Sequence, residues 1–142
     1  MKPRHKRFAL LSLAALGVAQ TIWPCDVLHC HDWQAALLPL LLKTVYARQP
    51  VFQAARSVLT IHNIAYQGVY SAESYGYLGL QAANFTTEKL EDHGRINFLK
   101  GGIVFSDAAN TVSPTYAREI ATAEFAFGLE GRDDAQRARG IG

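Results

Sequence analysis

The stretch Val58 to Gly68 reads V-L-T-I-H-N-I-A-Y-Q-G and indicates both the fold class and the place of the chemistry. Its first four residues are apolar or β-branched, which is typical of a strand buried on both faces. The run ends at His62-Asn63, and Gln67-Gly68 follow a few residues later. Ligands of open parallel sheets bind where strands end, so these polar side chains and Tyr66 suit a polyhydroxylated ligand. A tight turn satisfied by the histidine and asparagine explains the same residues, and the local pattern favours neither interpretation.

Length and composition limit the possible classes of protein. The chain has 142 residues, which is enough for one domain with its own core and too few for two ordinary domains. Its apolar fraction of 49%, its charged fraction of 18% and its net charge of +2 are those of a globular protein. This charge balance gives no reason to expect nucleic acid or a membrane as partner. Cys25 and Cys30 lack C-x-x-C spacing and are interpreted as small hydrophobic residues in a reducing compartment.

The N-terminal residues have two interpretations. A basic segment, 1–7, precedes an apolar run, 8–19, that ends in small residues, which is the outline of a signal peptide. The same stretch predicts a helix, because apolar residues recur at steps of three or four: Phe8, Leu11, Ala15, Val18 and Ile22. The apolar run is shorter than the ~20 residues that a membrane crossing needs. Composition alone slightly favours the signal peptide.

Further along the chain, strand and helix patterns alternate. We predict buried strands over 26–31 and 56–61, a further strand over 108–112, and helices over 33–47, 96–105 and 115–121. Asp32 is expected to cap the helix 33–47, in which Pro39 predicts a kink or a later start. Ser113-Pro114 should begin the last helix, and Gly101-Gly102 should allow close packing of the helix 96–105. The irregular segment 66–91 is predicted as a long functional loop. This alternation predicts α/β layers with a parallel sheet.

Two further patterns suggest sites. His29 and His31 lie two residues apart, so a strand would place both imidazoles on one side, with Asp32 after them. With His62 as a third ligand, and Asp107 or Glu130 in addition, this is the arrangement of a metal hydrolase. No further histidine or cysteine cluster completes it, and we expect no metal. The run 100–102, K-G-G, lies inside an apolar helical pattern without a following G-K-[ST], which excludes a phosphate loop.

Five segments together resemble bacterial glycogen synthases and plant starch synthases. They occur in the order of that family and read D-V-L-H-C-H-D-W-Q-A-A-L-L-P (26–39), T-I-H-N-I-A-Y-Q-G (60–68), I-N-F-L-K-G-G (96–102), T-V-S-P-T-Y-A-R-E-I (111–120) and E-F-A-F-G-L-E-G (124–131). Residues 7–16, R-F-A-L-L-S-L-A-A-L, resemble the internal helix that precedes the H-D-W strand, so the signal peptide is rejected. The resemblance assigns residues 1–131 to part of the N-terminal catalytic domain and leaves 132–142 as a divergent tail.

The resemblance implies a GT-B architecture, in which two Rossmann-like domains face each other across the active site. This chain would contribute a Rossmann-like parallel sheet with flanking helices from the N-terminal, acceptor-side domain. The implied reaction transfers glucose from ADP-glucose to the non-reducing end of an α-1,4-glucan with retention, without metal or other cofactor. The implied partners are ADP-glucose and the glucan, with no nucleic acid and no membrane. The implied location is the cytoplasm of a bacterium or a plastid.

The resemblance also implies roles for single residues. His62 would contact the transferred glucose, and Asp32 would hold a sugar hydroxyl or order the site, so both are candidate catalytic residues. Candidate substrate-binding residues follow in the same loop: Asn63, Tyr66, Gln67 and Gly68. Such a site would stabilise a cationic, oxocarbenium-like sugar by aimed dipoles rather than by a strong base.

Some parts of the family pattern are not found. The glycine-rich K-x-G-G-L loop would precede Met1, and the C-terminal domain with its arginine–lysine pair would follow. Residues 132–142, R-D-D-A-Q-R-A-R-G-I-G, do not continue toward the family's N-G-[IV]-D segment. We therefore expect a truncated fragment that is inactive by itself, with a non-catalytic remnant or weak glucan-binding module as the alternative.

Overall fold

The computed structural model describes residues 4–122 and Leu129. The segment 124–131, apart from Leu129, and the predicted tail 132–142 lie outside the described residues, as does the candidate ligand Glu130. The elements follow in the order α1 (Arg4–Thr21), β1 (Val27–His31), α2 (Asp32–Ala35), α3 (Leu37–Lys43), η1 (Pro50–Phe52), β2 (Arg56–Ile61), β3 (Val69–Ser71), η2 (Ala72–Tyr77), η3 (Ala82–Asn84), β4 (Glu91–Asp92), β5 (Arg95–Asn97), α4 (Phe98–Phe105), β6 (Ala108–Thr111) and α5 (Pro114–Glu119).

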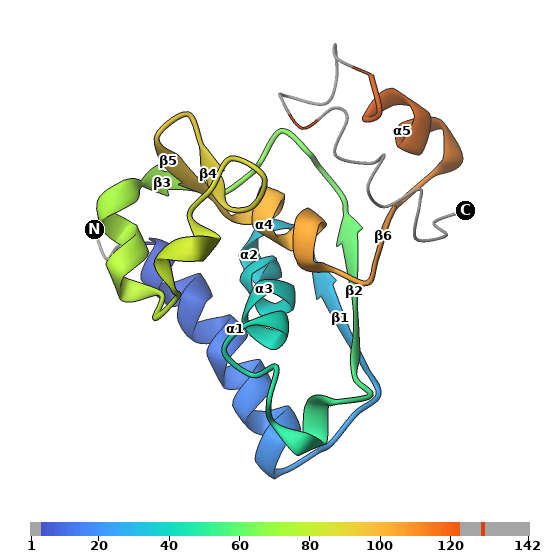
Figure 1. Cartoon of the computed structure of the whole chain (residues 1–142). Helices are drawn as coiled ribbons and strands as arrows, with labels where there is room; N and C mark the ends of the chain where they lie inside the picture. Colours follow the sequence, from blue (N-terminus) through green and yellow to red (C-terminus); the bar gives the residue numbers. More distant parts are fainter. Residues whose placement is uncertain (1–3, 123–128, 130–142) are drawn as a thin grey trace.

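The main sheet is parallel and has the strand order β1-β2-β6, as the alternation of strands and helices predicts. His31 pairs with Thr60, and Ile61 pairs with Thr111, so the carboxyl ends of the three strands lie at one edge. Helices α1 to α4 gather on one side of this sheet, while α5 lies beyond its carboxyl edge (Figure 1). The predicted α/β class is therefore confirmed.

Burial differs between the two strands that carry the histidines. In β2, Leu59, Thr60 and Ile61 are buried, as a strand covered on both faces should be. In β1 only Leu28 and Cys30 are buried, and the alternate residues are exposed. The prediction of a buried strand at 26–31 is thus wrong for one face, because the helices cover only the face of β1 that carries Leu28 and Cys30.

The N-terminal helix is present, but its predicted apolar stripe is not the buried one. The residues of α1 that face the core are Ala9, Ser12, Leu16 and Ala19. Leu11 and Val18, which the spacing had placed inside, are about half exposed, at 49% and 48%. The helix α1 packs against α3, and the small side chains of its inner stripe permit this close approach.

The predicted helix 33–47 is two helices, α2 and α3, separated by Ala36. Pro39 is the third residue of α3, where a backbone N–H would have no partner within the helix, so the expected later start is confirmed. The prediction that Asp32 caps this helix is wrong. His31 occupies the N-cap position, and Asp32 has φ of 55° and directs its carboxylate to another strand.

The segment 66–91 is more ordered than the predicted loop. It contributes β3 and β4 to a small antiparallel sheet of order β3-β5-β4, together with the 3-10 helices η2 and η3. The helix expected at 96–105 begins only at Phe98, because residues 95–97 form β5. Asn97 then caps α4, its side chain accepting a hydrogen bond from the Lys100 backbone N–H at 3.0 Å. The cap predicted at Ser113 for α5 is confirmed.

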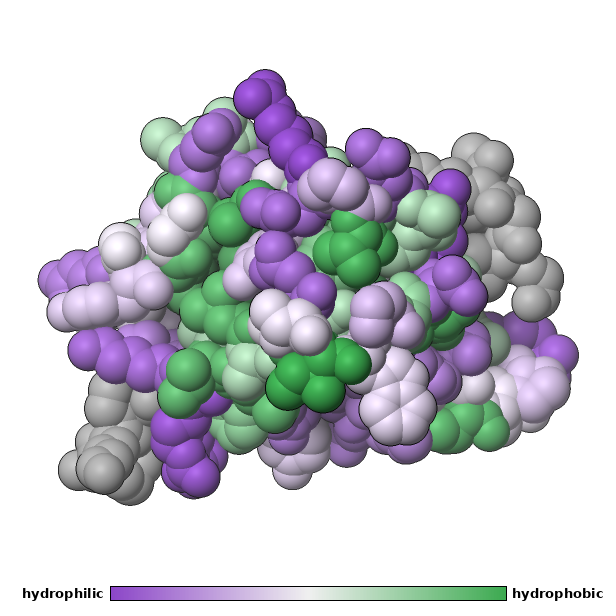
Figure 2. Space-filling view, turned by 90° about the horizontal axis from the view of Figure 1, so that it is seen from below, coloured by the Kyte–Doolittle hydropathy of each residue, from purple (hydrophilic) through white to green (hydrophobic). Residues whose placement is uncertain are grey.

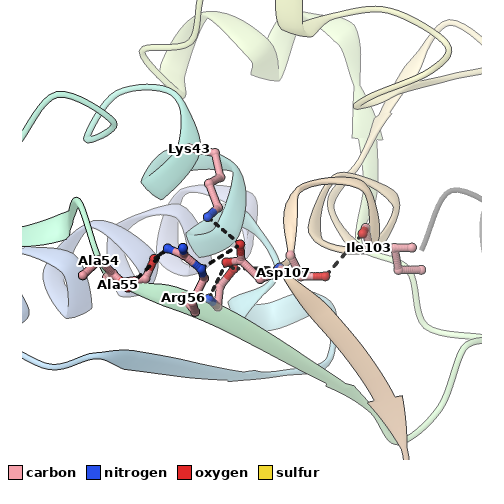
Figure 3. Close-up of polar contacts among 8 residues, drawn as sticks. Lys43, Ala54, Ala55, Arg56, Ile103 and Asp107 are labelled. Atoms are coloured by element: carbon pink, nitrogen blue, oxygen red, sulfur yellow. Dashed lines mark hydrogen bonds and ion pairs between the residues drawn. The ribbon is translucent and has the colours of Figure 1, made fainter. Parts of the chain in front are cut away.

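An ion cluster joins the amino ends of the strands to α3. Asp107 accepts hydrogen bonds from Lys43 Nζ and from the Ser57 backbone N–H, each at 2.7 Å (Figure 3). Partial burial by itself would raise the pKa of Asp107, but these hydrogen bonds outweigh it and lower the pKa below its usual value. Asp107 therefore serves to anchor β6, far from the histidines at the opposite edge.

Several large apolar side chains remain on the surface. Figure 2 shows apolar residues between polar ones on the lower face of the molecule, the side toward which α1 ends in Figure 1. Ile22 and Trp23, just after α1, are each 75% exposed.

Within the part of the chain that the structure describes, no helix combines the length and apolar character that a membrane crossing needs.

Candidate functional site

The predicted neighbours Asp32 and His62 meet at the carboxyl edge of the sheet. Asp32 Oδ1 accepts hydrogen bonds from the backbone N–H groups of His62, at 2.7 Å, and Asn63, at 3.3 Å. Aspartate is one of the few residues that tolerates a left-handed backbone, so Asp32 can turn its carboxylate toward β2. The carboxylate thereby fixes the direction in which the chain leaves β2 and presents His62 at the surface.

The imidazoles of this edge form hydrogen bonds with each other and with the sheet. His31 Nδ1 lies 3.0 Å from His62 Nε2, so one ring must donate to the other. His29 Nε2 lies 2.7 Å from Thr60 Oγ1, which in turn donates to Asn110 Oδ1 at 2.6 Å. The prediction that His29 and His31 face one side is confirmed, with ring centroids 4.4 Å apart. The hydrogen bond between His31 and His62 holds the His62 ring in a fixed orientation.

The geometry does not favour the metal hydrolase. Among the described residues, no group of three or more His, Cys, Asp or Glu side chains is arranged to hold a metal ion. Asp107 lies at the opposite edge of the sheet, in the ion cluster with Lys43. One ring nitrogen of each of these three histidines is hydrogen-bonded, His31 to His62 and His29 to Thr60.

The loop after His62 is held from two sides. Asn63 Oδ1 accepts a hydrogen bond from the Ala65 backbone N–H at 3.0 Å, which forms a local turn. The Ile64 backbone N–H donates to the hydroxyl of Tyr116, on α5, at 2.9 Å. Tyr116 was not among the sequence candidates, because its partner lies 52 residues earlier in the chain.

The other three candidates line a cavity of about 550 Å³. Tyr66, Gln67 and Gly68 form one wall, and the remaining lining residues are Arg4, Trp33, Ala65, Val69, Tyr70, Asp92, His93 and Arg95. A volume of this size is within the range of ligand pockets. Gly68 has φ of 65°, and a Cβ there would lie 2.4 Å from Trp33 Cε3, so only glycine lets the indole lie against the loop.

Two buried polar side chains hold lining residues of the pocket in place. Asn97 Nδ2 donates to Gln67 Oε1 at 2.6 Å and to Asp92 Oδ2 at 3.2 Å. Lys100, only 1% exposed, donates to the backbone oxygen of Glu91 and lies 3.8 Å from Asp92 Oδ1. A buried ammonium needs such partners, so Lys100 fixes the Asp92 carboxylate and is fixed by it.

Comparisons with known proteins agree with this architecture. The family model described as starch synthase catalytic domain matches residues 2–132. The chain belongs to this starch synthase family. The glycogen synthase of Koribacter versatilis is 49% identical over 126 residues, which are 89% of this chain and 26% of that protein. The glycogen synthase of Thermotoga maritima is 53% identical over 106 residues, which are 75% of this chain and 22% of that protein.

A solved structure of a starch synthase catalytic domain has the same fold as this chain. The catalytic domain of Starch Synthase IV from Arabidopsis thaliana, bound to ADP and acarbose, superposes with a TM-score of 0.88 at 36% identity. The match covers all of this chain and 30% of that one. The chain thus spans about a quarter of the length of the curated relatives it matches, and its parallel sheet with flanking helices is part of a GT-B catalytic domain.

The sequence predicts the loop but not the side chains that support it. Asn97 and Lys100 lie in the I-N-F-L-K-G-G segment, whose resemblance to the family implies no role for either side chain. The sequence feature that could have identified them is a lysine and an asparagine within an otherwise apolar run. Polar side chains in such a run are buried only where they have hydrogen-bond partners. Trp33 likewise belongs to the H-D-W motif, which implies no role for the indole.

Proposed function

We propose that these residues form part of the acceptor-side domain of an enzyme that transfers glucose from ADP-glucose to the non-reducing end of an α-1,4-glucan, with retention and without a cofactor. Because the chain spans about a quarter of its relatives, the activity belongs to the whole polypeptide that contains such a stretch. The bacterial relatives favour a bacterial cytoplasm over a plastid as its location.

The observation that carries the proposal is the hydrogen bond from the His62 N–H to Asp32 at the carboxyl edge of the sheet. In open α/β sheets this edge is where substrates bind. The imidazole of His62 is exposed, and its orientation is set by His31. A preoriented dipole of this kind can contact the glucosyl group as positive charge develops on its ring, without the cost of reorienting during the reaction.

Asp32 acts in this proposal mainly by holding the loop and secondarily as a hydroxyl acceptor. One of its oxygens, Oδ1, accepts both backbone hydrogen bonds, so Oδ2 is the atom proposed to receive a sugar hydroxyl. Tyr66, Gln67 and Gly68 shape the wall beside the reacting centre, and Asn63 holds the turn that leads into it. The ADP and acarbose bound to the Arabidopsis protein support a nucleotide sugar and a glucan as the two substrates of this family.

The test is a chimera in which residues of this chain replace the matched segment of the Thermotoga maritima glycogen synthase. We expect the chimera to transfer labelled glucose from ADP-glucose to glycogen. We expect His62→Ala to lower kcat by about 10²–10³-fold, the usual effect of losing one preorganised contact to developing charge. His62→Gln, which retains a side-chain donor, should recover part of this loss. Full activity of a folded His62→Ala chimera would contradict the proposal.

A further inference from the structure

The three histidines at the carboxyl edge of the sheet form a row in which the direction of each hydrogen bond can be assigned. The ring centroids of His29 and His31 are 4.4 Å apart, and those of His31 and His62 are 5.3 Å apart. The three side chains are exposed, but their backbones are held. His29 and His31 belong to β1, and the His62 N–H donates to Asp32. The row therefore presents imidazole nitrogens to solvent from a fixed backbone.

The proton of His29 is assigned through its hydrogen-bond partner, Thr60. The hydroxyl of Thr60 donates its single proton to Asn110 Oδ1 at 2.6 Å. The same hydroxyl oxygen lies 2.7 Å from His29 Nε2, so it must accept a hydrogen bond there, and His29 carries a proton on Nε2. This bond holds the His29 ring in place, and the His29 ring in turn lies against that of His31.

Two arrangements of the proton satisfy the contact between His31 and His62. Because His31 Nδ1 lies 3.0 Å from His62 Nε2, either His31 donates through Nδ1–H or His62 donates through Nε2–H. Neutral histidine in water carries its proton mainly on Nε2. The first arrangement requires the less stable tautomer in both rings, whereas the second has the more stable tautomer in both. A hydrogen bond from His62 Nε2 to His31 Nδ1 is therefore favoured.

We propose, on the basis of the proposed function, that His31 is a positioning residue that accepts the Nε2–H of His62 and so leaves His62 Nδ1 as an unprotonated acceptor for the glucosyl group. Among the residues that the structure describes, none forms a hydrogen bond with His62 Nδ1. The lone pair of Nδ1 is the negative end of the imidazole dipole, which favours positive charge developing on the sugar ring. The opposite tautomer would direct an N–H, the positive end, to the same place.

The direction of the bond is tested by NMR spectroscopy of the chimera, prepared with nitrogen-15-labelled histidine. We expect both His31 and His62 to carry their protons on Nε2. We also expect a scalar coupling across the hydrogen bond, between His62 Nε2 and His31 Nδ1. The resonances of the two rings are assigned by their loss in His31→Leu and His62→Gln. A proton on His62 Nδ1, or the absence of a coupling between the two rings, would overturn the proposal.

Kinetic measurements test whether this arrangement matters for glucose transfer. His31→Leu removes the acceptor, so we expect kcat of the chimera to fall at least fivefold. KM for ADP-glucose should stay within twofold, because the lost contact acts mainly in the transition state. His31→Asn places a carbonyl oxygen near the position of Nδ1 and should keep kcat within threefold. Val27→Ala is the matched control, since Val27 is 54% exposed on the same face of β1, and it should leave kcat unchanged.

These results separate the role of His31 from the proposed function. An unchanged kcat in a folded His31→Leu chimera would overturn the positioning role. Equal losses of kcat in His31→Leu and His31→Asn would also overturn it, because the asparagine retains an acceptor. A chimera that shows the expected coupling but transfers no glucose would support the proton assignment and contradict only the proposed function.

Discussion

The carboxylate of Asp32 accepts a hydrogen bond of 2.7 Å from the backbone N–H of His62, a residue 30 positions further along the chain. The bond connects the carboxyl ends of two neighbouring parallel strands, β1 and β2. It exists because Asp32 adopts a left-handed backbone and turns away from the helix that it begins. The position of the proposed catalytic histidine therefore depends on a side chain from another strand.

Substitutions at Asp32 should separate its backbone conformation from its carboxylate. Asp32→Gly permits φ of 55° but removes the acceptor of the His62 N–H, so we expect kcat of the chimera to fall at least tenfold. Asp32→Asn keeps both an acceptor oxygen and tolerance of the left-handed conformation, so it should retain more activity than Asp32→Gly. Steady-state transfer of glucose to glycogen measures both. Equal activity of the two variants would show that the hydrogen bond does not position His62.

A pair of glycine substitutions should have opposite effects on stability. A Cβ on Gly102 would lie 2.6 Å from Ala36 Cβ and 2.9 Å from Ala36 O, so Gly102→Ala should destabilise the fold by about 1–3 kcal/mol. A Cβ on Gly17, within α1, would have no atom within 4 Å, so Gly17→Ala should stabilise the fold by about 0.5–1 kcal/mol. Urea unfolding of both variants measures the difference. A neutral Gly102→Ala would mean that α2 and α4 do not pack as closely as described.

The Asp107 cluster should give a pH-dependent contribution to stability. The folded-state pKa of Asp107 is lowered from its ordinary value of 3.8, so its ionised form stabilises the fold above that pH. Asp107→Asn should cost about 1–2 kcal/mol at pH 7, because it removes the charge that Lys43 and Ser57 contact. This difference should shrink as the pH falls below 3.8 and through the lowered pKa. Asp26→Asn, an exposed carboxylate at the same edge, is the control and should show neither effect.

The two cysteines should differ in reactivity. Cys30 is 1% exposed, and burial raises the pKa of its thiol to about 12, so it carries almost no thiolate at pH 8. Cys25 is a free, half-buried thiol. We expect iodoacetamide at pH 8 to label Cys25 in the folded protein and to label Cys30 only in urea, as measured by mass spectrometry. Equal labelling of both thiols without urea would contradict the burial of β1 against the helices.

Much of the framework is predictable from local patterns in the sequence. The apolar run 58–61 predicts β2, and Ser113-Pro114 predicts the start of α5, because both signals lie within a few residues of the element that they define. The glycine pair at 101–102 likewise predicts close packing of α4, which Ala36 and Leu90 confirm. The order of the five family segments adds the family itself, which the match over 2–132 confirms.

Other features depend on contacts between distant residues. The face that α1 buries is set by α3, and for this reason the apolar spacing selected the wrong stripe. The segment 66–91 has little periodicity of its own and becomes ordered through pairing with β5, which follows it in the chain. A short local window contains neither partner, so sequence periodicity cannot predict either arrangement.

By itself, the sequence determined the α/β class, the parallel order of strand and helix, and the strand end at which Asp32 and His62 lie, because these follow from local periodicity, caps and motifs. Only the tertiary structure decided that Asp32 holds the His62 backbone instead of capping its own helix, that His31 orients the His62 ring, and that Asn97 supports Gln67 and Asp92. The physical reason is that a side-chain hydrogen bond needs its partners within about 3 Å, and for most of these pairs that proximity is created by packing segments about 30 residues apart.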